Sequence, residues 1–488
     1  MELELKFALP AQDGAALKKQ LSRVALIGKR HPHQERLHNT YFDTPEHLLK
    51  TSGMALRVRQ LGDSAQPRWV QTLKIGGPAA SALSQRGEWE LPLASDQLDQ
   101  RLLDGTPWTR FDPQGQVFSA LTPVFTTHFE RLSWLVQAGD ARAEVALDLG
   151  EVHMDGHTSP ICELEIELLE GTPDALFTIA SSIAEHLPLL PSHMSKAERA
   201  YRLAQGTLDA PLRARPPLLN ESMDYQQVAQ MVLRECFLQF TANLNALQGS
   251  DAPELLHQAR IGWRRFKSAL KLLRLNGSSS RFPDRQALQP LLAAMAALRD
   301  LDVAATEVFP LYAEAYQASD PQRTQHWQRL QDALEDARLQ HRATLRHTLG
   351  TPAVGRVLVE ITRWLETQTL PVPDALRATR GAAPGKWLKK RVAQLADQLD
   401  AMPQHSKDAA EQHAVRILCK RLRYSVECLR PLLPAKRAEH WYQHTTQKQT
   451  QIGIARDHQQ ALRIAQQLGA PEGIVEFLRG AAFGSLRV

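Results

Sequence analysis

The sequence is poor in cysteine and lacks a long apolar run. Its 488 residues include only four cysteines, at positions without metal-ligand spacing: Cys162, Cys236, Cys419 and Cys428. So few cysteines exclude a disulfide framework and indicate reduced packing residues. No stretch approaches the roughly 18 apolar residues of a membrane span, and the N-terminus lacks a basic region followed by an apolar one. We therefore expect a cytoplasmic protein that has no membrane partner.

The charge is unevenly distributed along the chain. Residues 1–206 hold 20 Lys and Arg against 26 Asp and Glu, whereas residues 207–488 hold 38 against 27. Three prolines interrupt any helix between residues 207 and 222, and the apolar periodicity lapses there. We predict a first domain over residues 1–206, a linker over 207–222 and a second domain over 223–488.

Polar and apolar residues alternate in about eight segments of the first half, which is the pattern of β-strands. In the clearest case, CELEIELLE, Glu163, Glu165 and Glu167 alternate with apolar residues. A single strand of this kind is most simply a solvated sheet face. Because charge of both signs recurs in several strands, the set favours a closed barrel whose charged faces turn inward around a polar ligand.

Charges of both signs in one cavity suit a phosphate chain. Arg and Lys bind the non-bridging oxygens, and Arg matches them in a bidentate way. Carboxylates repel phosphate, but they can hold a hard divalent cation that in turn coordinates phosphate oxygens. The pattern therefore predicts metal-assisted attack of water on phosphorus.

A family resemblance rests on an ordered set of short motifs. The opening ELELK is followed by NTYFDTP, MALRVR, QTLK, RGEWE, EVALD, ELEIE and SKAERAY. Over about residues 1–205 this set resembles the CYTH superfamily, the triphosphate tunnel metalloenzymes. The resemblance implies a tunnel that binds a triphosphate, with Mg²⁺ or Mn²⁺ as the cofactor.

Carried over by position, the resemblance implies metal-site carboxylates at Glu2, Glu4, Glu88, Glu90, Glu144, Asp148, Glu163 and Glu165. It implies a triphosphate cradle made of Lys6, Arg57, Arg59, Lys74, Arg86, Arg131 and Lys196. Catalysis is expected to depend on Glu4 and Lys6. Lys6 either positions the attacking water or stabilises the leaving phosphate. Glu167 shares the same face by spacing but ranks below its two neighbours.

Other polar residues of the first half are better explained by structure. Asp43 stands where it can cap a short helix begun by Pro45. His31, His33 and His38 lack the spacing of a metal site. We therefore expect these histidines at loop or edge positions.

A basic stripe occurs twice in the second half. The first copy follows one helix face at offsets of 0, 3, 7, 10 and 14, with His257, Arg260, Arg264, Lys267 and Lys271. The offsets 0, 3, 7 and 10 recur 156 residues later at His413, Arg416, Lys420 and Arg423. An Arg-Asp pair follows each copy, at Arg299-Asp300 and Arg456-Asp457. Like charges at this spacing repel, so the duplication favours an anion-binding face over a merely solvated one.

The second half resembles the CHAD domain, the conserved histidine α-helical domain, over about residues 223–488. The matching residues are the two stripes and the segment ALRDLDVA, although Gln459 stands where Asp302 would align in the second copy. The resemblance implies a helical bundle whose basic surface binds inorganic polyphosphate through His257, Arg260, Arg264, Lys267, His413, Arg416, Lys420 and Arg423. Nucleic acid is the rival polyanion, but few aromatic residues interleave with the stripes.

Together these features predict an α+β chain. An N-terminal eight-stranded antiparallel β-barrel is followed by an all-α domain of two repeated helical bundles. A tunnel coupled to a long basic helical half resembles the bacterial inorganic triphosphatases, so tripolyphosphate is the expected substrate and diphosphate and phosphate the products. Two alternatives stay open: a polyphosphate-binding scaffold with little turnover, and a hydrolase or cyclase that acts on nucleoside or thiamine triphosphate.

Overall fold

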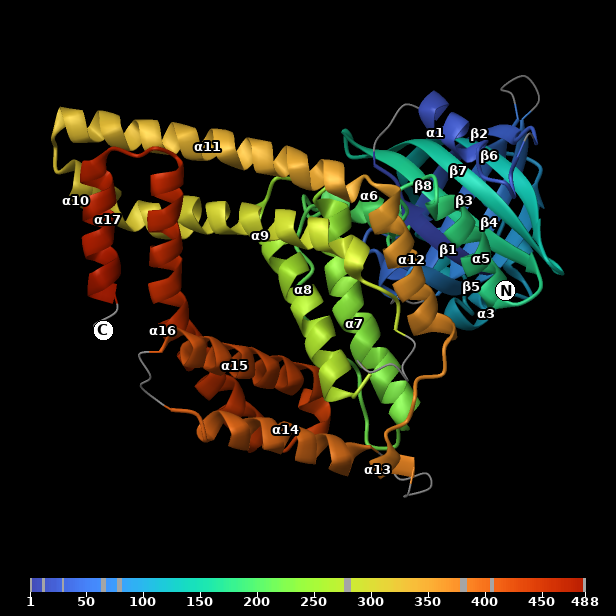
Figure 1. Cartoon of the computed structure of the whole chain (residues 1–488). Coiled ribbons are helices and arrows are strands. Elements are labelled where there is room, and N and C mark those ends of the chain that lie inside the picture. The colour runs from blue at the N-terminus through green and yellow to red at the C-terminus, as the bar shows by residue number, and fades with distance from the viewer. Residues whose placement is uncertain are drawn as a thin grey trace. The chain divides into compact units, whose positions relative to one another are not determined.

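The computed structural model divides into two compact units, which Figure 1 shows with their elements labelled. One unit holds residues 1–210 and 350–368, and the other holds residues 211–349 and 369–488. The structure describes residues 2–10, 14–28, 30–62, 67–76, 81–275, 282–377, 384–403 and 408–485. Among the helices within these ranges, none combines the length and apolar character needed to cross a bilayer.

Eight antiparallel strands close into a barrel in the first unit. They run in the order β5, β4, β3, β2, β6, β7, β8, β1, and β1 pairs back to β5 to close the ring. The strands are β1 (Glu2–Ala8), β2 (His33–Asp43), β3 (Met54–Leu61), β4 (Arg68–Ile75), β5 (Leu83–Leu93), β6 (Thr122–Ala138), β7 (Ala141–Met154) and β8 (His157–Glu170). A two-residue strand, β9 (Leu190–Pro191), adds to β1. The predicted barrel is thereby confirmed.

The alternation of apolar and charged residues places apolar side chains on the outer face of the barrel wall and charged side chains on the inner face. Leu5 and Phe7 of β1 are fully buried in an apolar core together with α5 residues such as Phe177 and Ile183. Their neighbours Glu2, Glu4 and Lys6 point the other way, toward the inside of the ring, because successive strand residues face opposite sides. The outer core therefore leaves the inner face free for charged side chains.

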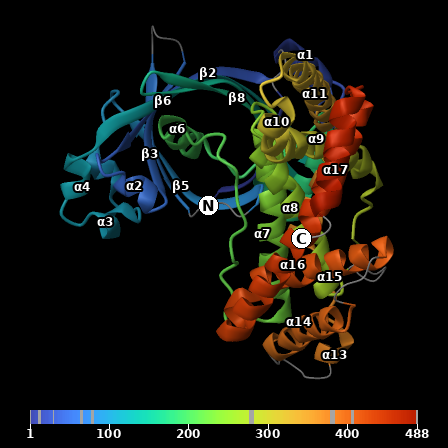
Figure 2. The same ribbon diagram turned by 90° about the vertical axis from the view of Figure 1, so that its left-hand side faces the viewer.

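Short helices complete the barrel unit. They are α1 (Gly14–Leu21), α2 (Leu48–Thr51), the 3₁₀ turn η1 (Gln100–Leu103), α3 (Trp108–Phe111), α4 (Gln116–Ser119), α5 (Pro173–Ala184) and α6 (Lys196–Ala204). Helix α6 lies along the inner side of the curved sheet (Figure 2). Its residues Ala200 and Tyr201 pack against Phe125 and Phe129 of β6. The first residue of α6 is thus carried to the inner face of the barrel.

One helix from the second half of the sequence belongs to the barrel unit. Helix α12 (Pro352–Thr367) packs on α5 and β9. Val359 joins the apolar core outside the barrel, and Gly355 leaves room for the backbone of Leu189. Arg363 forms a bidentate pair with Asp174 at the start of α5. The barrel core is therefore completed by a segment about 170 residues beyond α5.

The second unit is helical. Its helices are α7 (Tyr225–Ala246), α8 (Pro253–Leu272), α9 (Gln289–Val303), α10 (Phe309–Gln317), α11 (Pro321–Leu349), α13 (Asp374–Arg377), α14 (Gly385–Asp400), α15 (Ala409–Leu429), α16 (Ala435–Gln467) and α17 (Glu472–Ser485). Short turns are η3 (Gln286–Leu288), the π-turn η4 (Ala304–Val308) and η5 (Arg430–Leu432). His257 and His413 each stand at the fifth position of their helices, α8 and α15. The predicted α+β class, with a barrel followed by a repeated helical part, is confirmed.

Candidate active site and anion-binding face

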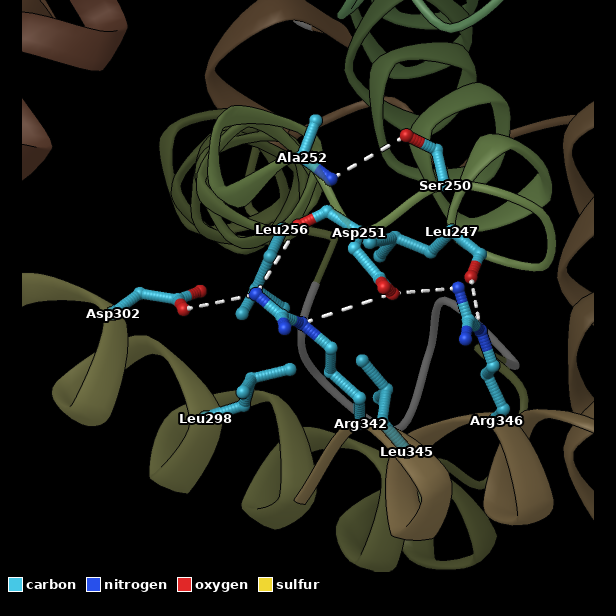
Figure 3. A pocket seen from close by; sticks show the side chains of 10 residues that line it. All are labelled: Leu247, Ser250, Asp251, Ala252, Leu256, Leu298, Asp302, Arg342, Leu345 and Arg346. Atoms are coloured by element: carbon cyan, nitrogen blue, oxygen red, sulfur yellow. Dashed lines mark hydrogen bonds and ion pairs between the residues drawn. The ribbon is translucent and has the colours of Figure 1, made fainter. Parts of the chain in front are cut away.

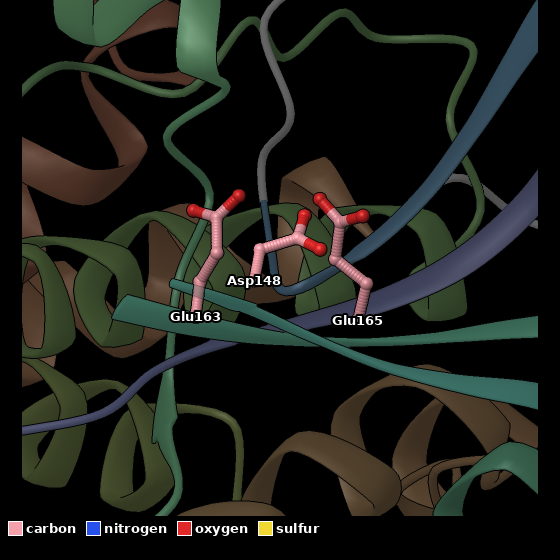
Figure 4. Close-up of side chains that lie close together, drawn as sticks. All are labelled: Asp148, Glu163 and Glu165. Carbon is pink, nitrogen blue, oxygen red and sulfur yellow. The ribbon is translucent and has the colours of Figure 1, made fainter. Parts of the chain in front are cut away.

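Three carboxylates gather on the inner face of the barrel. Asp148 of β7 stands directly opposite Glu163 of β8, and Glu165 follows two residues later on the same face. One carboxylate oxygen of each lies within 4.8 Å of the others. Figure 4 shows the three side chains pointing to the same side of the sheet (Figure 4). We call Asp148, Glu163 and Glu165 the carboxylate cluster.

Two lysines neutralise part of the carboxylate cluster. Lys6 Nζ lies 2.6 Å from Glu165 and 3.2 Å from Glu163. Lys196 Nζ, at the start of α6, lies 2.7 Å from Asp148 and 3.1 Å from Glu165, and it also pairs with Glu163. Burial would lower the pKa of Lys6, but Glu163 and Glu165 outweigh it and raise that pKa. Lys6 is therefore held in its charged form.

Arg131 of β6 is the third cation of this cluster. Its Nε and Nη2 atoms each lie 2.7 Å from a carboxylate oxygen of Asp148, which is the bidentate geometry of a strong pair. Burial would raise the pKa of Asp148, but Arg131 and Lys196 lower it. Three acids thus face three bases, and this part of the site balances its own charge.

A second charged group joins β1 to β3, β4 and β5. Lys74 Nζ lies 3.0 Å from Glu2 and 2.8 Å from Glu88. Arg57 lies 3.7 Å from Glu88 and 3.8 Å from Glu90. Burial, followed by the hydrogen bond with Glu88, raises the pKa of Glu2 to about 8. This pair of carboxyl groups accordingly shares a proton near neutral pH.

Three further carboxylates form a row across adjacent strands. The register places Glu4 of β1 opposite Glu167 of β8, and Glu167 opposite Glu144 of β7. Among the described residues none of the three forms an ion pair within 4.0 Å, and Glu4 accepts a hydrogen bond from Ser84 at 3.0 Å. Burial, followed by the charge of Glu88, raises the pKa of Glu167, and Glu144 and Glu4 add to this. We call Glu4, Glu144 and Glu167 the carboxylate row.

Two residues outside the predicted set position the arginines of β3. Arg59 Nε donates to the side-chain oxygen of Asn39 at 2.8 Å and lies 3.6 Å from Glu90. Arg57 donates to the hydroxyl of Tyr41 at 3.3 Å. Asn39 and Tyr41 are two residues apart within NTYFDTP, so the period-two spacing of a strand predicts that they lie on the same face.

The remaining predicted residues of the barrel have clear positions. Arg86 stands opposite Glu2 in the register of β1 and β5, and within the described ranges it forms no ion pair. Asp43 caps α2, because it accepts from the backbone N–H groups of Leu49 at 2.8 Å and Lys50 at 3.1 Å. That helix begins at Leu48, three residues later than predicted.

The expectation for one histidine was wrong. His38 lies inside β2, which has β3 and β6 on its two sides, rather than in a loop or at an edge. Its Nδ1 lies 2.9 Å from Nδ1 of His128 on β6. Sequence spacing could not show this contact, because the partner is 90 residues away.

The two basic stripes converge in the helical unit. Helices α8 and α15 are in contact, and Arg264 of α8 is close enough to Arg416 and Lys420 of α15 to lower the pKa of both. Burial, followed by Arg264 and Arg416, lowers the pKa of Lys420 to about 7. Burial, followed by Arg264, lowers the pKa of Arg260 to about 10. Positive charge is therefore concentrated where the stripes meet, and Asp300 and Asp457 offset only part of it.

The other predicted stripe residues vary in their surroundings. Burial, followed by Arg299, lowers the pKa of His257 to about 4, so this ring is neutral at pH 7. Arg423 pairs with Glu427 at 3.6 Å and is less free to bind an anion. Lys267 and His413 are exposed on their helices. All eight residues lie on α8 or α15.

Asp302 lies apart from the stripes in an ion-pair network. It is almost fully buried and accepts from Arg338 Nε at 3.0 Å, with Arg342 at 3.8 Å. Figure 3 shows Arg342 and Arg346 reaching from α11 toward Asp251 in the small pocket beside it (Figure 3). These pairs tie α9 and the start of α8 to α11. We read Asp302 as a structural residue of the bundle, and this agrees with the presence of Gln459 in the second copy.

Two family models match the chain. The CYTH domain model matches residues 1–201, and the CHAD domain model matches residues 231–466. The inorganic triphosphatase of Haemophilus influenzae is 33% identical over 205 residues, which cover 41% of this chain and 54% of that relative. The matched region therefore spans about half the length of this curated relative.

Solved structures are also similar to parts of the chain. The CHAD domain from the plant Ricinus communis is 24% identical with a TM-score of 0.45, over 56% of this chain and 91% of that one. A putative adenylyl cyclase from Hippeastrum, described as having a dominant triphosphatase activity, is 17% identical with a TM-score of 0.28, over 42% of this chain and 96% of that one.

Proposed function

We propose that this chain, which joins a CYTH domain over residues 1–201 to a CHAD domain over residues 231–466, is a metal-dependent triphosphatase. Its substrate would be inorganic tripolyphosphate, cleaved to diphosphate and phosphate. The observation that carries the proposal is the inner face of the barrel, where basic side chains and carboxylates alternate within ion-pair distance.

The basic side chains would bind the phosphate oxygens. In the free protein Lys6, Arg131 and Lys196 are oriented by the carboxylate cluster, so their positions are set before substrate enters. Arg57 and Arg59 are held in a similar way by Tyr41 and Asn39. Such preorganised donors stabilise charge on a transferring phosphoryl group without rearranging during the reaction.

The carboxylate row is the part of the site that best suits a divalent cation. Glu4, Glu144 and Glu167 offer hard oxygen donors, and among the described residues none of the three forms an ion pair within 4.0 Å. Mg²⁺ or Mn²⁺ bound there would polarise the phosphoryl oxygens and neutralise developing charge. The carboxylate cluster is the weaker candidate for a metal, because three bases already match its three acids.

Lys6 lies between these two groups on β1, two residues from Glu4. Its Nζ is fixed by Glu163 and Glu165, and it stays protonated. A fixed ammonium group can orient the attacking water or stabilise the leaving phosphate, and both roles act on the chemical step rather than on substrate binding. Loss of Lys6 should therefore reduce turnover more than binding.

The helical unit would bind long inorganic polyphosphate at the converging stripes. Arg260, Arg264, Arg416 and Lys420 supply positive charge, and among the described residues none of the four forms an ion pair within 4.0 Å. A linear polyanion would relieve their mutual repulsion, and the paucity of aromatic residues along the stripes disfavours nucleic acid.

A side-by-side assay tests the proposal. Phosphate release by the full chain is measured with tripolyphosphate, ATP and thiamine triphosphate, with Mg²⁺, with Mn²⁺ and after chelation. We expect tripolyphosphate to be hydrolysed fastest and chelation to abolish turnover. Glu4→Gln and Lys6→Met should each lower kcat by about 100-fold or more, which is the usual effect of losing one preorganised electrostatic group.

Glu170→Gln is the matched control. It lies at the exposed end of β8, the strand that carries Glu167, and among the described residues it pairs only with Arg142 at the surface. This variant should retain full activity. A preference for ATP or thiamine triphosphate would replace the tripolyphosphate assignment, and tight binding without turnover would favour the scaffold alternative. Normal hydrolysis by Glu4→Gln would contradict the site itself.

A further inference from the structure

Three histidines and a glutamate gather on the outer face of the barrel. His38 of β2 stands directly opposite His128 of β6, and His128 stands opposite Glu151 of β7. His153 lies two residues beyond Glu151 and therefore shares its face. Asn39, the neighbour of His38, is fully buried on the inner face, so the histidine points outward. The group is separate from the charged interior and independent of the proposed hydrolysis.

The imidazole rings of His38 and His128 are close enough to share one ion, and the His153 ring lies beside that of His128. Nδ1 of His38 lies 2.9 Å from Nδ1 of His128, and the centroids of the His128 and His153 rings are 5.1 Å apart. Two nitrogens at about 2.05 Å from one metal lie about 2.9 Å apart at a right angle and about 3.3 Å apart at a tetrahedral angle. The His38–His128 pair thus fits a shared ion with a movement of a few tenths of an ångström.

Glu151 completes the arrangement. One of its oxygens lies 3.4 Å from Nε2 of His153. A carboxylate beside one ring nitrogen can orient the imidazole and leaves the other nitrogen available to a metal. Short side-chain movements would bring this second nitrogen toward the His38–His128 pair, because diagonal neighbours on adjacent strands lie within reach of long side chains.

We propose that His38, His128 and His153 form a binding site for a transition-metal cation such as Zn²⁺, Ni²⁺ or Cu²⁺, with Glu151 as its supporting carboxylate. Imidazole suits these ions, whereas Mg²⁺ prefers oxygen ligands, so the site would not compete for the cation of the tunnel. His128 is exposed and His38 and His153 are half-buried, so the ion can arrive from solvent. Once bound, it would link β2, β6 and β7.

Metal titration of the full chain tests the site. Zn²⁺ binding is measured by calorimetry and Cu²⁺ binding by electron paramagnetic resonance, in the natural chain and in a His38→Asn/His128→Asn variant. We expect the double variant to lose one equivalent of tight Zn²⁺ binding and the corresponding imidazole nitrogen hyperfine signal. His33→Asn is the matched control, since this exposed residue lies on the same strand and should change neither result.

Thermal unfolding separates a metal site from a simple hydrogen bond between rings. A ligand that binds only the folded state raises Tm, so Zn²⁺ should raise Tm in the natural chain and in His33→Asn but less in the double variant. Unfolding without metal shows that the double variant folds. Equal Zn²⁺ stoichiometry, equal copper spectra and equal Tm shifts in all three proteins would overturn the proposal.

Discussion

The barrel and the helical unit differ in whether their basic side chains form ion pairs. In the barrel, Lys6 and Lys196 lie within 3.2 Å of carboxylate oxygens, and burial is offset by the partners. Along α8 and α15, Arg260, Arg264 and Lys420 face one another instead, and within the described ranges they form no ion pair. We call the paired charges of the barrel the matched set and the unpaired basic residues of α8 and α15 the unmatched set. Ion pairs hold the side chains of the matched set in place. The basic residues of the unmatched set repel one another, and a bound polyanion would reduce that repulsion. The first arrangement suits a specific small substrate, and the second suits a long polymer.

Removing a cation from the matched set should have the largest effect. Lys196→Met leaves the three acids of the carboxylate cluster with one base fewer in a buried site, and breaking such a pair lowers the free energy of unfolding by about 3–5 kcal/mol. Denaturant unfolding that follows the barrel measures this. Lys18→Met is the control, because its pair with Glu130 is partly solvent-exposed and should contribute less than about 1 kcal/mol. Equal stabilities for the two variants would mean that the cluster is not coupled.

The dependence of the barrel on α12 gives the next largest effect. A Cβ at residue 355 would lie 2.5 Å from the backbone nitrogen of Leu189. Gly355→Ala should therefore lower the free energy of unfolding of the barrel by about 1–3 kcal/mol. Gly453→Ala in α16 is the control, because a Cβ there meets nothing within 4 Å and should stabilise its helix by about 0.5–1 kcal/mol. If both changes stabilise, α12 does not pack as described.

Removing a cation from the unmatched set should leave the fold intact. Lys420→Met relieves repulsion with Arg264 and Arg416, so stability should rise by about 0.2–0.5 kcal/mol, while affinity for long polyphosphate falls. Reversing the charge at Arg260, Arg264, Arg416 and Lys420 together should abolish retention by polyphosphate. Binding is measured at several salt concentrations, because each lost phosphate contact lowers the salt dependence. Unchanged retention after fourfold reversal would place the binding surface elsewhere.

The smallest expected effect is a pH dependence of polyphosphate binding. Lys420 has a pKa of about 7, so it is mostly neutral at pH 8 and mostly charged at pH 6. A polyanion binds the charged form more tightly, so affinity should rise as pH falls through 7. Lys420→Arg keeps the charge at both values and should flatten this change. An identical pH profile in the two proteins would exclude Lys420 from the binding face.

Much of the candidate site followed from local spacing. Glu163 and Glu165, two residues apart on one strand, were predicted to share a face, as were Arg57 and Arg59 on another, and each pair points to the inside of the barrel. Spacing did not rank the carboxylates among themselves. Glu167 stood below its neighbours in the sequence prediction, yet the register places it between Glu4 and Glu144, in the row whose described members form no ion pair within 4.0 Å.

Contacts between distant segments were beyond local spacing. His38 and His128 meet because β2 pairs with β6, and α12 joins the barrel unit although most of its sequence neighbours form the helical unit. The periodicity of a single segment predicts neither contact. Both contacts depend on which strands pair and which apolar surfaces pack together in the folded chain.

The amino-acid sequence alone determined which residues of one strand or helix share a face. Side chains of a strand alternate between two faces, and a helix brings residues three or four positions apart to the same face. The sequence thereby determined an inward charged face in one half and two basic stripes in the other. The tertiary structure decided which of those charges are neutralised. Strand register and helix docking set the distances between residues far apart in the chain, and the energy of a charge depends on those distances.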